Sequence, residues 1–284
     1  MGRIAKELAK ASKLEAQKRA LKREQHKGNA VAVANGHSGG FDDEEGLINF
    51  ARLPSINPDE ECLEKNRIVA AQADSPQRAV YKVLRTRILQ RLRASEWNVI
   101  GVSGTGPGEG KTVTAINLAY SLAQDVNHHV VLVDLDLRRP SLHTYLGIEP
   151  NRDLSDYLSG TTALDQILVR PGESRLAIMT NQTTYRDSSE VLSSPELGTL
   201  VQQLRNLGPK TITIFDLPPA LAGDDVLAFA PLMDALLLVV AEGKCRREHL
   251  AEANELLQGV NIIGTILNQS REKSPSSGYY DYYG

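Results

Sequence analysis

The sequence predicts an α/β protein built on a doubly wound, mainly parallel sheet with helices on both faces. From Trp97 onward, six short runs are almost continuously apolar, and helix-length segments separate them. Strands with this pattern are buried on both faces, as in parallel sheets covered by helices. Regular alternation of such strands with helices indicates one doubly wound sheet. The expected strands are residues 97–102, 129–134, 176–180, 211–216, 235–241 and 261–268.

Two segments precede this domain. Residues 1–27 carry nine Lys or Arg against three Glu, a net charge of +6, and their Ala-, Lys-, Glu- and Leu-rich composition predicts a helix. That helix is either simply solvated or a contact for anionic lipid or an acidic partner. Residues 28–69, which begin with a glycine-rich and acidic stretch, are expected to form a flexible linker.

The domain itself is expected to span residues 70–268. Residues 75–95 predict a helix that leads into the first strand, and "SPEL" at 194–197 marks a helix start, with Ser194 as the cap and Pro195 in the first turn. Residues 269–284 are expected to form a disordered tail. It ends in "GYYDYYG", which holds four of the nine tyrosines of the chain.

Composition excludes several classes of protein. The net charge of −3 over 284 residues is not that of a polycation, so no nucleic-acid partner is expected. Cys62 and Cys245 lack metal-ligand spacing and indicate free thiols in a reducing compartment. No apolar run approaches the roughly 20 residues that span a bilayer, and no apolar signal-peptide core is present near the N-terminus. We therefore expect a cytoplasmic protein.

The strongest local motif is a phosphate-binding loop, "GTGPGEGKT", between the first strand and a helix-forming segment. Its glycines, Gly106, Gly108 and Gly110, let backbone N–H groups point inward at phosphate oxygens, and the following helix adds its N-terminal dipole. Lys111 would reach the β and γ phosphates, and the Thr112 hydroxyl would face Mg²⁺. The domain is thus predicted to be a P-loop NTPase.

One position departs from the strict G-x-x-x-x-G-K-[ST] pattern, because Thr105 stands where the first glycine is expected. The order of strand, loop and helix nevertheless favours a nucleotide site over a chance glycine-rich turn. The nucleotide contacts expected from this segment are Gly106, Gly108, Glu109, Gly110, Lys111, Thr112 and Val113.

Three aspartates follow buried strands. Asp134 and Asp136 end "VVLVDLD" and Asp216 ends "TITIFD". Ligands of such sheets bind beyond the carboxyl ends of the strands, where the phosphate loop also lies. A single aspartate after a strand is usually a cap, but three beside a phosphate loop indicate a metal-linked site.

These motifs together resemble the bacterial tyrosine kinases of polysaccharide export and assembly, especially autokinases encoded with exopolysaccharide loci. The resemblance covers residues 70–284 and includes "GTGPGEGKT", "LVDLDLRRP", "IFDLPP" and the tyrosine tail. ParA- and MinD-type ATPases are broader relatives that carry an extra lysine at the position of Gly106. Its absence here favours the kinase branch.

The resemblance implies that ATP and Mg²⁺ are used. It implies that Thr112, Asp136 and Asp216 organise the metal, and that Asp134 or Asp136 accepts the tyrosine proton. It also matches Asn268 to an asparagine that contacts adenine. The implied catalytic residues are Lys111, Asp134, Asp136 and Asp216, and the implied autophosphorylation sites are Tyr279, Tyr280, Tyr282 and Tyr283.

The family also implies partners. We expect a separate membrane chain-length-determining activator, with the kinase recruited to the inner face of the membrane. The family's lead-in helix carries E-x-x-R-x-x-R for ring-like self-association, but here Ala79 and Lys82 replace the glutamate and the first arginine, with Arg85 retained. Lysine does not reproduce an arginine–carboxylate fork. Self-association is still expected, although ring formation through this motif is in doubt.

The sequence thus predicts an ATP-dependent tyrosine autokinase that phosphorylates its own tail and regulates exopolysaccharide or capsule synthesis and export. One alternative is a ParA- or MinD-like regulatory ATPase without kinase activity. Another is a nucleotide-dependent scaffold whose tyrosines bind a partner.

Overall fold

A computed structural model describes residues 48–73 and 75–270 of the chain. The chain divides into two compact units, residues 1–42 and 43–284, and the described residues all belong to the second. The expected basic helix at 1–27 lies outside the described residues, and so do residues 271–284 of the tail expected at 269–284.

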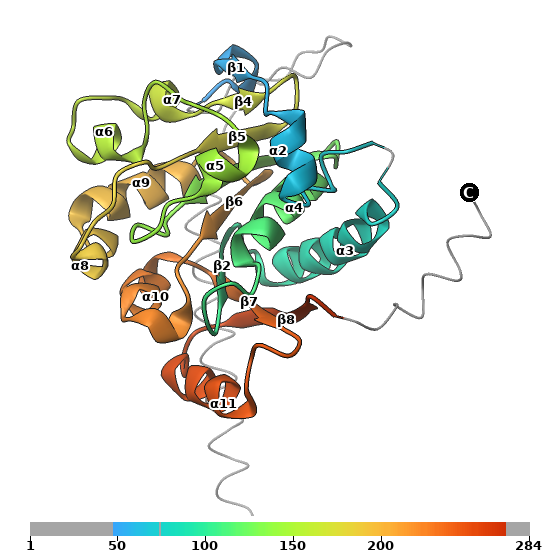
Figure 1. Cartoon of the computed structure of the whole chain (residues 1–284). Coiled ribbons are helices and arrows are strands. Elements are labelled where there is room, and N and C mark those ends of the chain that lie inside the picture. Colours follow the sequence, from blue (N-terminus) through green and yellow to red (C-terminus); the bar gives the residue numbers. More distant parts are fainter. Residues whose placement is uncertain (1–47, 74, 271–284) are drawn as a thin grey trace, which may run out of the picture. The chain divides into compact units, whose positions relative to one another are not determined.

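The centre of the unit is a six-stranded sheet in the order β5-β3-β6-β2-β7-β8, and every pair of neighbouring strands is parallel. The six strands expected from the sequence are thus confirmed in a single sheet (Figure 1). Their bounds are β2 Val99–Gly104, β3 His129–Asp134, β5 Leu176–Met179, β6 Thr211–Asp216, β7 Ala235–Ala241 and β8 Ile262–Asn268.

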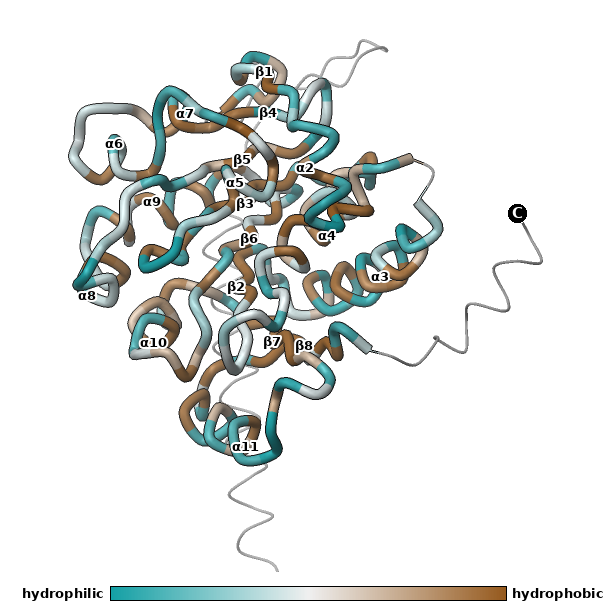
Figure 2. The backbone as a smooth tube through the Cα atoms, in the orientation of Figure 1, coloured by the Kyte–Doolittle hydropathy of each residue, from teal (hydrophilic) through white to brown (hydrophobic). Residues whose placement is uncertain are grey.

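Helices cover both faces of the sheet. Along β3, Val130 and Leu132 pack into the core on one face, and Val131 and Val133 into the core on the other. This double burial explains why the strands lack polar alternation, and Figure 2 shows them as mostly apolar along their length. One face is covered by α2 (Glu60–Lys65), α3 (Arg78–Ser95), α4 (Lys111–Ala123) and α5 (Leu142–Leu146).

The second core lies under the remaining helices. Among them, α9 starts as the sequence predicts, because the Ser194 hydroxyl accepts from the Leu197 N–H and Pro195 occupies the first turn. The helices that contribute to this core are α6 (Leu154–Leu158), α7 (Leu164–Ile167), α8 (Ser188–Leu192), α9 (Pro195–Arg205) and α10 (Asp225–Phe229). Leu257, directly after α11 (Arg247–Leu256), also packs there. No helix in the described ranges is both long and apolar enough to cross a bilayer.

Residues 48–69 differ from the flexible linker expected there, because they form packed structure. They contain η1 (Phe50–Arg52), β1 (Ser55–Ile56) and α2. β1 pairs in parallel with the short strand β4 (Arg170–Pro171). Ile68 is fully buried, and the Phe50 ring stacks on His129 with centroids 4.4 Å apart. Elements this short show no hydrophobic period, so the sequence pattern did not reveal them.

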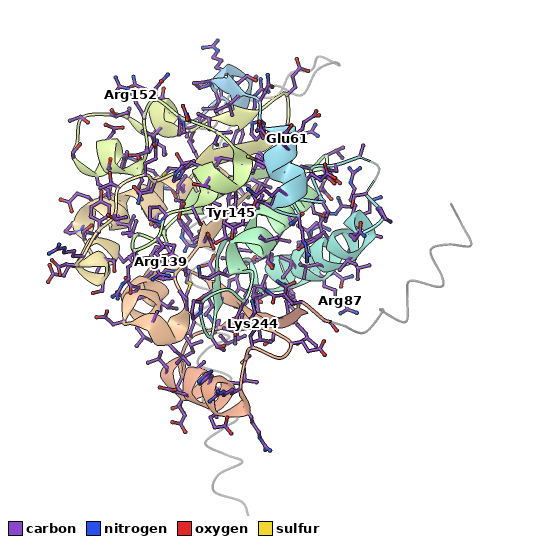
Figure 3. The ribbon with its side chains drawn as sticks, viewed as in Figure 1. Glu61, Arg87, Arg139, Tyr145, Arg152 and Lys244 are labelled. Carbon is purple, nitrogen blue, oxygen red and sulfur yellow. The ribbon has the colours of Figure 1, made fainter. Side chains whose placement is uncertain are left out.

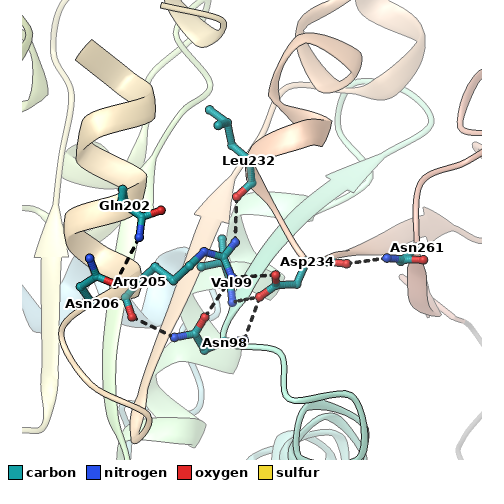
Figure 4. Close-up of polar contacts among 8 residues, drawn as sticks. All are labelled: Asn98, Val99, Gln202, Arg205, Asn206, Leu232, Asp234 and Asn261. Atoms are coloured by element: carbon teal, nitrogen blue, oxygen red, sulfur yellow. Dashed lines mark hydrogen bonds and ion pairs between the residues drawn. The ribbon is translucent and has the colours of Figure 1, made fainter. Parts of the chain in front are cut away.

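A polar cluster fixes the amino ends of the strands, opposite the edge where the aspartates lie (Figure 4). The Asp234 carboxylate accepts from the backbone N–H groups of Asn98 and Val99, both at 2.9 Å, and pairs with Arg205 at 2.7 Å. The Asn261 side chain donates to the Asp234 carbonyl at 2.9 Å. These contacts join the starts of β2, β7 and β8 to the end of α9, so they fix the strands at the edge of the sheet opposite the candidate site.

Candidate active site

The loop after β2 has the backbone of a phosphate-binding loop. Gly108 and Gly110 have φ angles of +74° and +86°, in the left-handed region that favours glycine. Gly110 caps the N-terminus of α4, whose first two residues are Lys111 and Thr112. A helix N-terminus that follows such a loop presents unpaired N–H groups to an anion. Gly106 lies in the loop and Val113 in the first helical turn, as the motif requires.

The side chain of Glu109 braces this loop from inside. Glu109 is 2% exposed, and its carboxylate accepts from the Thr105 N–H (2.6 Å), the Thr105 hydroxyl (2.6 Å) and the Gly106 N–H (2.9 Å). A Cβ on Gly104 would lie 2.6 Å from this carboxylate. The glycine missing at Thr105 is therefore compensated by Gly104 and Glu109. The carboxylate of Glu109 faces the loop interior, so its expected nucleotide contact is left to the backbone.

Three side chains hold the outer carbonyls of the loop. Asn268, at the end of β8, donates to the Glu109 carbonyl at 2.9 Å, which places it beside the loop. Gln269 and Lys244 both donate to the Gly108 carbonyl, at 2.9 and 3.0 Å. Sequence reasoning missed these two residues. Lys244, which is labelled in Figure 3, follows the end of β7. Because ligands of such sheets bind beyond the carboxyl ends of the strands, its position could have been predicted.

The three aspartates come together as expected from the strand ends. Asp134 and Asp216 are register neighbours on β3 and β6. Asp136 forms an ion pair with Lys111, with 2.7 Å between Nζ and Oδ2, and both side chains are nearly buried. Lys111 and the aspartates therefore share one small region beside the phosphate loop.

Asp134 and Asp136 play different structural parts. The Asp134 carboxylate accepts the backbone N–H groups of Ser141 (2.8 Å), Leu142 (2.9 Å) and Asp136 (3.2 Å). The Asp134 carboxylate therefore fixes the backbone of the loop that follows β3. Asp136 pairs instead with the lysine of the phosphate loop. Strict alternation along a strand would make both carboxylates face one ligand in the same way, and the structure differs from that expectation.

Burial and mutual repulsion shift the pKa values of these groups. Burial raises the pKa of Asp134 well above its usual value, and the nearby Asp216 raises it further. Burial also raises the pKa of Asp216 to about 6, against the opposing effect of Lys111. For Lys111, burial lowers the pKa, but Asp216 and Asp136 outweigh this effect and leave it raised. Lys111 therefore keeps its positive charge at neutral pH.

Asp216 fits a role toward a divalent cation. Both of its carboxylate oxygens are buried, and neither accepts a hydrogen bond of standard geometry, although Thr112 is close enough to lower its pKa. A buried carboxylate without partners is costly unless a ligand supplies them. Within residues 48–73 and 75–270 no group of three or more His, Cys, Asp or Glu forms a ready metal cage. Thr112, Asp136 and Asp216 are the residues that could hold Mg²⁺ here, and the charge of the ion would offset the burial of the two carboxylates.

A phosphate-binding loop beside buried strand-end aspartates, on a wholly parallel sheet, defines a P-loop NTPase domain. The family model of the CobQ/CobB/MinD/ParA nucleotide binding domain matches residues 100–282, more than half of the chain.

Comparison with individual relatives narrows the class of protein from P-loop NTPases to one family. The chain is 30% identical over 224 residues to the tyrosine-protein kinase YwqD of Bacillus subtilis, covering 78% of this chain and 92% of the relative. It is 30% identical to the tyrosine-protein kinase etk of Escherichia coli over 69% of this chain, but spans only 27% of that longer protein. The solved kinase domain of E. coli ETK superposes with a TM-score of 0.64 at 27% identity, covering 78% of this chain and 91% of that domain. The chain belongs to the bacterial tyrosine kinases.

Proposed function

We propose that this chain transfers the γ-phosphoryl group of ATP to tyrosine hydroxyls of its own C-terminal tail. The observation that carries the proposal is the placement of Lys111 between the phosphate loop and the buried carboxylates of Asp136 and Asp216. This arrangement supplies a cation for the phosphates and carboxylates for a metal and a proton. The tail supplies four hydroxyls, on Tyr279, Tyr280, Tyr282 and Tyr283.

In this mechanism, Lys111 moves from Asp136 to the β and γ phosphates when ATP binds. The tyrosine oxygen attacks the γ phosphorus, the bond from that phosphorus to the β–γ bridging oxygen breaks, and ADP leaves. The tyrosine proton passes to a carboxylate, since a free tyrosine has a pKa of about 10. The candidates for this role are Asp136 and Asp134, whose oxygens already accept three backbone N–H groups.

When bound, Mg²⁺ would neutralise charge on the phosphate oxygens. Its ligands from this chain would be Thr112, Asp136 and Asp216. The unpartnered oxygens of Asp216 support this assignment most directly.

Each phosphotyrosine adds about −1.5 to −2 charge, so four add roughly −6 to −8. A tail docked in the acidic site of a neighbouring copy would then be repelled, and phosphorylation would loosen the assembly. We place this switch in the control of exopolysaccharide or capsule synthesis and export, together with a membrane co-polymerase that activates the kinase.

Self-association through the lead-in helix takes a modified form in this proposal. Lys82 is exposed on α3, while Arg85 donates to the Ser121 carbonyl of its own chain at 2.9 Å. Arg85 is therefore partly engaged within the subunit. With Ala79 in place of a glutamate, assembly is expected to use other contacts.

The full chain, incubated with ATP and Mg²⁺, is expected to gain one to four phosphoryl groups on the tail. Intact-mass analysis before and after ATP, followed by peptide mapping, measures their number and place. The matched control replaces Tyr279, Tyr280, Tyr282 and Tyr283 by phenylalanine, which removes only the hydroxyls. ATP turnover without any added phosphate, even with the membrane activator present, would favour a regulatory ATPase instead.

The basic segment 1–27 is proposed to bring the kinase to the inner face of the membrane. Its net charge of +6 is expected to give binding to anionic vesicles that weakens as salt rises. Vesicle sedimentation of the full chain and of a variant lacking residues 1–27 measures this. Equal binding by both proteins at low salt would reject a membrane role for the segment.

A further inference from the structure

Arg138 lies two residues beyond Asp136 and makes contacts that the mechanism above does not use. Its Nε donates to the Ser188 hydroxyl at 2.9 Å, and its Nη2 lies 2.9 Å from Asp225 Oδ2 in an ion pair. The Ser188 hydroxyl in turn donates to the other oxygen of Asp225. These three residues form the Arg138 cluster.

The cluster joins three segments that follow three different strands. Arg138 belongs to the loop after β3, and Ser188 is the first residue of α8, which follows β5. Asp225 is the first residue of α10, which follows β6 and the loop that begins after Asp216. All three strands end at the edge of the sheet that carries the site.

The cluster is built into the fold. Ser188 is fully buried and the Asp225 side chain is 2% exposed, so this carboxylate depends on its partners. Gly223 leaves the room that the ion pair needs, since a Cβ there would lie 2.7 Å from Arg138 Nη2 and 3.0 Å from Asp225 Oδ2. Asp224, by contrast, is 70% exposed and 4.0 Å from Arg138.

The three guanidinium nitrogens of Arg138 all lie close to oxygens of the chain. Nε faces Ser188, Nη2 faces Asp225, and Nη1 donates to the Ala222 carbonyl at 3.5 Å. An arginine at a phosphoryl-transfer site is often expected to contact the transferring phosphate. Here Nε and Nη1 donate to oxygens of the chain and Nη2 forms an ion pair, so the guanidinium has the geometry of a clamp between loops.

The clamp acts on the two carboxylates assigned to the metal. Asp136 shares the short loop of Arg138, and its backbone carbonyl and carboxylate both accept the Arg139 N–H. Asp216 begins the segment that ends at Asp225, and its carbonyl accepts the Leu135 N–H at 2.9 Å. The pair of Arg138 and Asp225 therefore ties the loop that carries Asp136 to the segment that follows Asp216.

We propose that Arg138 is a positioning residue, which through Ser188 and Asp225 holds Asp136 and Asp216 at the separation that a nucleotide-bound divalent cation requires. The inference rests on the proposed use of this site for a magnesium nucleotide. It does not require that the tail be the phosphoryl acceptor.

The test measures ADP affinity by calorimetry, with Mg²⁺ and with EDTA, on the full-length protein. In Arg138→Gln, the gain in affinity that Mg²⁺ provides is expected to fall about tenfold, as for other residues that support metal ligands. ADP affinity in EDTA is expected to change less than about twofold, since the phosphate loop is untouched. Asp225→Asn is expected to reproduce this loss, and the double variant to add little to it.

Three results would overturn the proposal. A matching loss of affinity in EDTA would make Arg138 a direct phosphate ligand. A lowered thermal midpoint with an unchanged effect of Mg²⁺ would make the cluster purely structural. The control Asp224→Asn alters only the exposed carboxylate. If it lowered the gain in ADP affinity from Mg²⁺ as much as Arg138→Gln does, the effect would not be specific to the pairing of Arg138 with Asp225.

Two further features keep the test decisive. If Arg138→Gln does not fold, Arg138→Lys replaces it, because lysine keeps the charge but cannot bridge Ser188 and Asp225 together. Wild-type protein that binds magnesium ADP but leaves its tail unmodified would contradict the proposed function alone. The affinity readout would still decide the role of Arg138.

Discussion

Replacing Lys111 by methionine is expected to lower ATP-dependent tyrosine phosphorylation by at least about 100-fold, the scale seen when a preorganised transition-state contact is removed. Lys111 is nearly buried, and the carboxylates around it keep it charged. Methionine fills similar space without a charge, so the β and γ phosphates lose their cation. Phosphate incorporation into the tail, followed by intact mass and anti-phosphotyrosine blotting, measures the effect.

The control is Lys210→Met, an exposed lysine directly before β6, at the end of the sheet opposite the phosphate loop. Because Lys210 has no part in the site, its loss is expected to change the rate by less than about threefold. Wild-type phosphorylation by Lys111→Met would exclude this loop as the phosphate site. Loss of phosphotyrosine in Lys111→Met would support the kinase interpretation, whereas partner binding that survives in this variant would support the scaffold interpretation.

The positions of the strands could be predicted because burial on both faces leaves a direct trace in the sequence. Residues 130–133 and 235–241 are apolar at every position, and each run lies in one strand. The strand-end aspartates followed from the same reasoning, since parallel strands bring their carboxyl ends to one edge. Asp134 and Asp216 are indeed register neighbours.

Other features depend on contacts between distant residues, which a single sequence does not display. Glu109 belongs to the phosphate-loop motif, yet its carboxylate accepts hydrogen bonds from Thr105 and Gly106 within the loop. The pairing of Arg138 with Asp225 joins residues that are far apart in sequence. Arg138 belongs to the "LVDLDLRRP" motif, but Asp225 stands in no motif, so only the folded structure brings the two together.

The different parts of Asp134 and Asp136 show the same limit at a shorter range. Alternation along a strand places both carboxylates on one side, but Asp136 lies just beyond the end of β3, where the chain leaves the sheet. The loop that follows then wraps its N–H groups around Asp134. The direction of each carboxylate is therefore set by the loop, and the strand pattern alone does not determine it.

Asp216→Asn is expected to have opposite effects on activity and on stability. Asparagine has nearly the shape of aspartate but no charge, so a metal ligand is lost and phosphorylation is expected to fall by at least about 100-fold. In the protein without nucleotide, neither buried oxygen of Asp216 accepts a hydrogen bond of standard geometry, and the cost of burial outweighs the attraction of Lys111. Removing their charge is expected to stabilise the fold at neutral pH.

The sign of the stability effect follows from the pKa of Asp216, which burial raises to about 6. Between the unfolded value near 4 and this folded value, the folded state binds more protons, so stability falls as pH rises. Asparagine removes that loss, which amounts to about 3 kcal/mol at pH 7 and vanishes below about pH 4. The thermal midpoint at pH 7 is expected to rise by roughly 6–12 °C.

Thermal unfolding of nucleotide-free protein at pH 4 and pH 7, together with the phosphorylation assay, measures both effects. Asp165→Asn serves as the matched control, because Asp165 is exposed on α7 and neither quantity is expected to change. A midpoint that falls in Asp216→Asn at pH 7 would mean that this carboxylate has stabilising partners in the folded chain. A metal ligand that is needed to neutralise charge cannot be replaced by a neutral amide without a large loss of activity. Activity above half of wild type would therefore show that Asp216 is not a metal ligand, and would leave Asp136 and Thr112 to hold the cation.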